Sequence, residues 1–164
     1  MTYTTKIISP KNEIKNKFLK FIENDKLVNF HPEKDPTISF TSYHKDPYDK
    51  GLVELYYKYL DPYIKEYVSK YHMNCIWYQI YKAKSGSFHN YHTHNSIDCH
   101  ISGVYYLKLP NSKISTEFII NNTPKQFNVK DGDLILFDAS IIHRSPPNTT
   151  RRDKIILSFN LDLS

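Results

Sequence analysis

The sequence is poor in glycine and cysteine and has no long apolar run. Four of its 164 residues are Gly and two are Cys. Cys75 and Cys99 lack the close spacing of a metal-binding pair, and two Cys are too few for a disulfide scaffold, so we expect buried free thiols in a reducing compartment. No stretch approaches the roughly 18 apolar residues of a membrane span, and residues 1–6 lack the hydrophobic region of a signal peptide. We therefore expect a soluble, cytoplasmic protein with no membrane partner.

Acidic residues are fewer than basic ones, but the basic excess is small and dispersed. The formal net charge is +5, with nineteen Lys and three Arg. A basic surface can attract nucleic acid. However, the chain contains no basic run of five or more residues, and blocks of like charge are typical of nucleic-acid-binding segments. We interpret the lysines as a solvated surface and do not expect a nucleic-acid partner.

Apolar residues (40%) and aromatic residues (15%) are abundant enough for one sizeable core. The N-terminal half predicts a short strand at 3–8 and an amphipathic helix at 10–24, which begins with a serine cap and a proline. Residues 29–48 are polar and proline-containing, which is typical of a long irregular connection. Helical periodicity returns over 47–71, where Asp61 and the proline after it should divide the segment into two helices.

After Met73 the pattern changes to short runs rich in β-branched and aromatic residues, separated by turn signals. The predicted strands are 75–82, 88–94, 99–109, 114–120, 125–129, 133–138, 140–145 and 153–162. Eight short strands at this spacing, with helices on the N-terminal side, indicate a mainly β, cupin-like jelly roll buttressed by α-helices. We expect a single domain over 1–164, with helical support in 1–72 and a β-barrel core in 73–164.

Three histidines and a lysine are the candidates for chemistry. Alternate residues of a strand point to the same face, so His92 and His94 can both point into a barrel. His143, from a distant strand, can complete one face of a metal ion, and Lys154 supplies a nearby cation. Three imidazoles with open positions beside them indicate a mononuclear iron site. By the same alternation His89 should face away, whereas His100 falls on the inward parity, where it can support the site.

The C-terminal half resembles the 2-oxoglutarate/Fe(II)-dependent oxygenase family, and more broadly the prolyl-4-hydroxylase-like branch of that superfamily. The resemblance lies in the order and spacing of its motifs: Trp77, Gly86, His92-x-His94, Ser102-Gly103-Val104-Tyr105-Tyr106-Leu107, Gly132-Asp133-Leu134-Ile135-Leu136-Phe137, His143, and Lys154 followed by Ser158-Phe159-Asn160. The N-terminal half carries little of it. The resemblance implies a double-stranded β-helix that holds Fe(II), with 2-oxoglutarate and O2 as cosubstrates.

In the resemblance, His92 and His143 take the two histidine-ligand positions, and His94 stands where many relatives carry the acidic member of a His-x-Asp pair. A three-histidine site keeps three protein ligands but lacks the negative charge of the usual 2-His-1-carboxylate set. Asp98 is the alternative third ligand, because the segment between His94 and Ser102 is longer than in the family pattern and a bulge there would turn Asp98 inward. We favour His94.

Lys154 matches the basic position that holds the distal carboxylate of 2-oxoglutarate. A lysine offers a point charge and not a two-pronged fork, so a second donor is desirable. Relatives often place a hydroxyl two residues further on, where this chain has Ile156. Tyr81 is the candidate replacement, and its alternative interpretation is a tyrosine of the core.

The resemblance implies a dioxygenase that hydroxylates a C–H bond of an unidentified substrate and releases succinate and CO2. Two alternatives stay open at this point: a cupin-type three-histidine metalloenzyme that does not use 2-oxoglutarate, and a non-catalytic jelly-roll binding module. A protein side chain, a free amino acid, a nucleobase and a small metabolite are all compatible substrates. We expect their contacts to come from 29–48, from 89–101 and from the loops that connect the strands.

Overall fold

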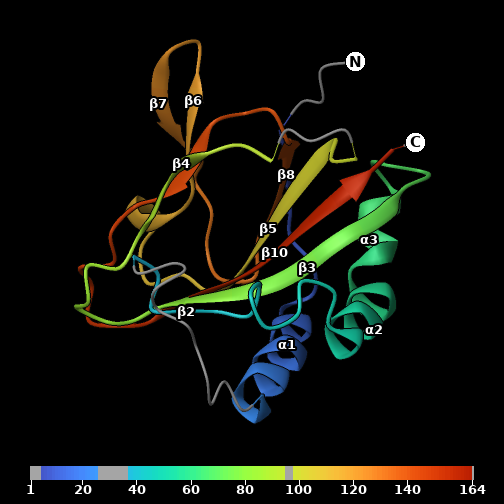
Figure 1. Cartoon of the computed structure of the whole chain (residues 1–164), viewed down its shortest axis with the longest axis horizontal. Helices are drawn as coiled ribbons and strands as arrows, with labels where there is room; N and C mark the ends of the chain where they lie inside the picture. Colours follow the sequence, from blue (N-terminus) through green and yellow to red (C-terminus); the bar gives the residue numbers. More distant parts are fainter. Residues whose placement is uncertain (1–4, 26–36, 95–97, 164) are drawn as a thin grey trace.

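The computed structural model describes residues 5–25, 37–94 and 98–163. Two antiparallel sheets pack face to face, and the helices lie together on the outer face of the larger sheet (Figure 1). The predicted mainly β jelly roll with N-terminal helices is thereby confirmed. The start of the predicted strand 3–8 and part of the predicted connection 29–48 lie outside the described residues.

The N-terminal half provides the helices and two short strands. These elements are β1 (Lys6–Ile8), α1 (Asn12–Asn24), β2 (Phe40–Thr41), α2 (Lys50–Tyr59) and α3 (Asp61–Lys65). α1 is amphipathic and buries Ile14, Phe18 and Ile22, at the helical spacing of its sequence. Asp49 caps α2 by accepting hydrogen bonds from two backbone N–H groups of the first turn. α2 and α3 divide at Asp61, as predicted.

The C-terminal half supplies eight strands in the predicted order. They are β3 (His72–Tyr81), β4 (His89–His92), β5 (Ile101–Lys108), β6 (Glu117–Ile120), β7 (Thr123–Gln126), β8 (Leu134–Asp138), β9 (His143–Ser145) and β10 (Lys154–Asp162), with a short 3-10 helix η1 (Ser112–Ile114) before β6. The six-stranded sheet has the order β1-β8-β5-β10-β3-β2, and the four-stranded sheet has the order β4-β9-β6-β7.

Because side chains alternate along a strand, one face of the large sheet packs against the helices and the other faces the smaller sheet. In β10 the four odd-numbered residues from Ile155 to Leu161 join the apolar core beneath the helices. The even-numbered residues from Lys154 to Asn160 therefore face the smaller sheet. Of these, Ser158 and Asn160 line a pocket between the sheets. The interior of the jelly roll thus holds polar side chains next to an apolar layer.

Gly103 lies at a close approach between two neighbouring strands of the larger sheet. A Cβ built on Gly103 would lie 2.2 Å from Cζ of Phe159, on the neighbouring strand β10. The ring of Phe159 in turn packs at 5.0 Å against that of Tyr56 in α2. The glycine in the middle of β5 is therefore required by the close approach of an aromatic ring.

Two further predictions concern the environment of the chain. Cys75 and Cys99 are both free thiols, as predicted, and Cys99 is buried, but Cys75 is only half-buried. Across the described ranges, every helix is too short or too polar to cross a membrane.

Candidate metal centre

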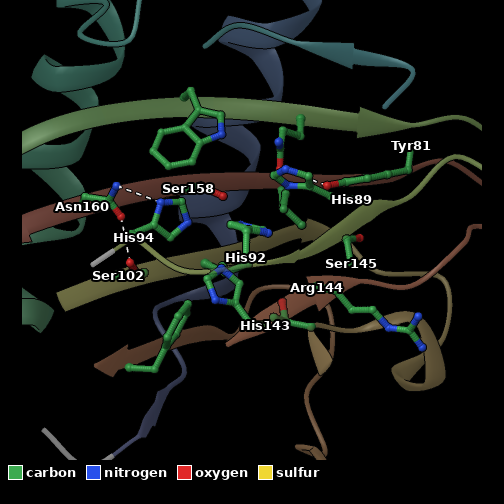
Figure 2. Close-up of a pocket in the computed structure, with 17 residues that line it drawn as sticks. Tyr81, His89, His92, His94, Ser102, His143, Arg144, Ser145, Ser158 and Asn160 are labelled. Carbon is green, nitrogen blue, oxygen red and sulfur yellow. Dashed lines mark hydrogen bonds between the residues drawn. The ribbon is translucent and has the colours of Figure 1, made fainter. Parts of the chain in front are cut away.

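The smaller sheet brings three histidines to one point. His92 at the end of β4 is paired in register with His143 at the start of β9. His94 follows β4, where its backbone N–H donates to the carbonyl of Ala139 at 3.0 Å. One nitrogen from each of the three rings lies within 4.8 Å of the others. Figure 2 shows the three rings turned toward one another between the two sheets. The predicted cluster is thus assembled in space.

Backbone carbonyls orient two of these imidazoles. Nδ1 of His92 lies 2.6 Å from the carbonyl oxygen of Asn90, and Nδ1 of His143 lies 2.9 Å from that of Ile141. A carbonyl oxygen only accepts, so Nδ1 carries the hydrogen in both rings. Nε2 is then left with its lone pair, which is the form that a metal ligand needs.

Burial keeps two of the three imidazoles neutral. Burial and, to a smaller extent, the neighbouring His92 lower the pKa of His94 to about 4. Burial followed by the same neighbour lowers the pKa of His143 to about 3. Both rings are therefore uncharged at pH 7, and they need not lose a proton before they bind a metal ion.

Asp98, the alternative third ligand, is exposed. It is not part of the three-histidine group, which includes His94. The geometry therefore favours the imidazole, and the identity of the third ligand stays a prediction.

The histidines line a pocket between the sheets. Trp77 and Gln79 of β3, Phe137 of β8 and Thr116 also line it. No carboxylate lines this pocket among the residues for which coordinates are described. The pocket therefore suits an anionic ligand better than a cationic one.

Lys154 is buried beside this pocket, with none of its surface exposed. Its ammonium donates to the carbonyl of Ile114 at 2.5 Å and to the hydroxyl of Ser145 at 2.7 Å. It also lies 5.1 Å from the centre of the Tyr81 ring, within the range of a cation–π contact. Within the described ranges it pairs with no carboxylate, and burial lowers the pKa of Lys154 to about 7. A buried cation without an anion is costly unless a ligand supplies one.

Tyr81 and Ser145 supply polar groups next to the ammonium. Tyr81 is fully buried, and its hydroxyl donates to Oε1 of Gln79 at 3.0 Å. Ser145 lies two residues after His143, and its hydroxyl accepts from Lys154. Ser145 was not predicted as a site residue, although its even spacing from His143 on a strand was the signal that places both on one face.

His89 departs from its predicted direction. The pairing of β4 with β9 shifts register between His89 and His92, and such an irregularity adds a residue and re-aims the side chains beyond it. The His89 ring therefore lies 4.0 Å from that of His92 and lines the pocket. His100 is exposed, and its Nδ1 lies 3.0 Å from a carboxylate oxygen of Asp162.

Comparison with known proteins identifies the fold. No family model matches the sequence, and no curated protein matches it either. The structure is similar to that of HygX from Streptomyces hygroscopicus with nickel and 2-oxoglutarate bound, with a TM-score of 0.71 and 13% identity over 98% of this chain and 83% of that one.

Two prolyl hydroxylases are also similar in structure. The viral collagen prolyl hydroxylase of Paramecium Bursaria Chlorella virus-1, solved as a 2-oxoglutarate complex, gives a TM-score of 0.63 and 15% identity over 99% of this chain and 97% of that one. A Trichoplax adhaerens prolyl hydroxylase, solved with a peptide fragment of hypoxia inducible factor, gives 0.65 and 14% over 96% and 83%. The chain therefore has the prolyl-hydroxylase-like jelly-roll fold that the sequence motifs predicted.

Proposed function

We propose that this protein is an Fe(II)- and 2-oxoglutarate-dependent dioxygenase that hydroxylates a C–H bond of its substrate and releases succinate and CO2. One observation carries the proposal. Three imidazoles, two of them kept neutral by burial, converge in a pocket that no described carboxylate lines, and the buried Lys154 ammonium lies beside the same pocket. The similarity of fold to proteins solved with 2-oxoglutarate agrees with it.

The spacing of these two features suits a short dicarboxylate. Ser145, which contacts Lys154, is two residues from His143 on β9, and a strand rises about 3.3 Å per residue. The ammonium contact and the histidine cluster are therefore separated along β9 by about 7 Å. This length is comparable to that of a five-carbon diacid, so one end can meet a metal ion while the other meets Lys154.

The residues present fit a divalent iron. We propose that His92, His94 and His143 hold Fe(II), because neutral imidazoles that donate through nitrogen are suitable ligands for this metal. When bound, iron supplies the activation of O2 and the oxidation of the C–H bond. The histidines fix the position of the metal ion, while the surrounding apolar residues limit access of water to it.

Lys154 orients the cosubstrate in this proposal. Its ammonium now donates to a backbone carbonyl and to Ser145, and a ligand carboxylate would add a charge-assisted hydrogen bond and neutralise the buried cation. The hydroxyl of Ser145, which accepts from Lys154, is then able to donate to the same carboxylate. Ser145 thus takes the place of the hydroxyl that the sequence lacks at Ile156, and the Tyr81 ring covers the ammonium.

Aromatic side chains next to the cluster are our candidates for substrate contact. The Trp77 ring lies 5.8 Å from that of His94, and Tyr43, 43% exposed, packs at 5.2 Å against Trp77. Proteins of this fold have been solved with hygromycin B and with a peptide fragment, so the fold admits ligands of different chemistry. We propose a small or extended substrate that approaches the metal centre along this aromatic wall.

Calorimetric titration tests the proposal with Ni(II), which does not support turnover. The wild-type protein should bind one Ni(II), and 2-oxoglutarate should bind more tightly to the nickel-loaded protein than to the free protein. His143→Ala should lose the metal ion. Lys154→Met should keep the metal ion and lose most of the affinity for 2-oxoglutarate. If Lys154→Met binds 2-oxoglutarate as the wild type does, the assignment of Lys154 is wrong. If the wild-type protein binds Ni(II) but no 2-oxoglutarate, a three-histidine metalloenzyme that does not use 2-oxoglutarate replaces this proposal.

A further inference from the structure

The three histidines differ in the group that Nδ1 of each ring contacts. Nδ1 of His92 and Nδ1 of His143 each face a backbone carbonyl two residues earlier in the chain. The local backbone therefore fixes the orientation of these two rings. Nδ1 of His94 instead lies 3.4 Å from the side-chain amide of Asn160 on β10. The orientation of the third imidazole therefore depends on a side chain from the opposite sheet (Figure 2).

Asn160 is buried, and polar neighbours on both sides hold its side-chain amide. Its side chain is 8% exposed, and its Oδ1 accepts a hydrogen bond from the hydroxyl of Ser102 at 2.8 Å. Its Nδ2 lies 3.4 Å from both the thiol sulfur of Cys75 and Nδ1 of His94. In β10, Asn160 is paired with Cys75 on one side and with Ser102 on the other, so the amide is fixed between three polar groups.

The direction of this amide decides which nitrogen of His94 carries the hydrogen. With Nδ2 toward the ring, the amide donates to the lone pair of Nδ1, and the hydrogen lies on Nε2. That form of His94 cannot offer Nε2 to a metal ion. With the amide rotated by half a turn, Oδ1 accepts from Nδ1–H, and the lone pair of Nε2 becomes available to the metal.

The rotated amide leaves every neighbouring group with a partner. Oδ1 then accepts from His94 and from the thiol hydrogen of Cys75, and Nδ2 donates to the hydroxyl oxygen of Ser102. Ser102 is able to accept because a hydroxyl has both a hydrogen and lone pairs. The two directions of the amide therefore use the same contacts and differ in the tautomer of His94 that they select.

We propose that Asn160 is the positioning residue of the metal centre, and that rotation of its amide sets His94 in its metal-binding form. The inference rests on the proposed metal site and deepens it. It explains how an imidazole takes the third position: a neutral amide orients the ring without placing a second buried charge beside the cluster. Asn160 supports His94 as a carbonyl supports each of the other two ligands.

Titration with Ni(II) alone tests this role. Asn160→Leu keeps the size of the side chain and removes its polar atoms, and we expect the Ni(II) affinity to fall about 10- to 100-fold, as for other residues that support a ligand. Asn160→Asp should restore it, because a carboxylate also accepts from Nδ1–H. Asn16→Leu is the matched control, because it makes the same substitution at an exposed position of α1 and should leave the affinity unchanged. Circular dichroism melting checks that each variant is folded.

Nuclear magnetic resonance reads the tautomer without any turnover. With ¹⁵N-labelled histidine, the ring signal that disappears in His94→Gln should shift on addition of Zn(II) from the Nε2–H form to the Nδ1–H form. In metal-free Asn160→Leu this signal should instead be a mixture of the two forms, because the amide that selects between them is absent. An altered signal in that variant with a normal melting temperature separates positioning from a general loss of structure.

The outcomes separate this inference from the proposed function. If Asn160→Leu binds Ni(II) as tightly as the wild type and gives the same His94 signal, the role of Asn160 is refuted while the metal site stands. If the wild-type protein binds no Ni(II), both the proposed metal site and this inference are wrong. If Asn160→Asp fails to restore affinity although it is folded, acceptance from Nδ1–H is not what the residue provides.

Discussion

Binding of 2-oxoglutarate should weaken steeply above pH 7, because it requires the charged form of a buried lysine. Burial lowers the pKa of Lys154 from its ordinary value of 10.5 to about 7. Only the ammonium form attracts the distal carboxylate, so the apparent dissociation constant rises as the charged fraction falls. At pH 9 about one lysine in a hundred is charged, which raises the dissociation constant about 100-fold, or about 2.7 kcal/mol.

The assay is calorimetric titration of 2-oxoglutarate into nickel-loaded protein between pH 6.5 and 9. Above pH 7 the histidines His94 and His143 are already neutral, and the carboxylates of the ligand are fully charged, so Lys154 is the group whose titration governs binding. Binding at pH 8 should take up about one proton, because the ligand draws Lys154 back into its charged form. This uptake appears as a dependence of the binding enthalpy on the buffer.

Two controls separate Lys154 from other effects of pH. The ligand 2-oxobutyrate keeps the 2-oxo acid but lacks the distal carboxylate, so its weaker affinity should not change over this range. Lys154→Met should bind 2-oxoglutarate about 10- to 100-fold more weakly at pH 6.5, through loss of a charge-assisted hydrogen bond of about 1.5–3 kcal/mol, and with no dependence on pH. A wild-type affinity that stays constant from pH 7 to 9 would refute the assignment of Lys154.

Three further predictions concern stability and the cosubstrate contacts. Because the folded pKa of Lys154 is depressed to about 7, the unfolded chain holds more protons above that pH, so wild-type stability in urea should rise from pH 7 toward pH 9, and Lys154→Met should lack this rise. Gly103→Ala should lower the free energy of unfolding by about 1–3 kcal/mol, since its Cβ meets Phe159 at 2.2 Å; an unchanged urea midpoint would contradict the packing argument. Ser145→Ala should weaken 2-oxoglutarate binding by about 0.5–1.5 kcal/mol and leave Ni(II) affinity intact, which the same titrations measure.

Much of the fold follows from local sequence patterns. The eight predicted strand runs match β3 to β10 in order, because alternating apolar residues and turn signals act over a few positions at a time. The apolar face of α1 follows from its helical period in the same way. Two of the three histidines also follow from alternation, since His92 and His94 are separated by an even step.

The contacts that organise the site could not be predicted in this way. Asn160 reaches His94 because β10 lies opposite the end of β4, and no local pattern encodes that meeting. Lys154 meets the carbonyl of Ile114 through a similar approach of distant segments. His89 turned toward the pocket because the strand pairing is irregular, which a regular alternation does not anticipate.

The most direct test of the central claim is the visible spectrum of the protein with Fe(II) and 2-oxoglutarate under strictly anaerobic conditions. A metal-to-ligand charge-transfer band arises only when a 2-oxo acid chelates the iron, so it reports the metal ion and the cosubstrate together. The account predicts a band for the wild-type protein, which should be lost in His143→Ala. Absence of the band in wild-type protein that has bound Fe(II), or its persistence in His143→Ala, would contradict the proposed centre.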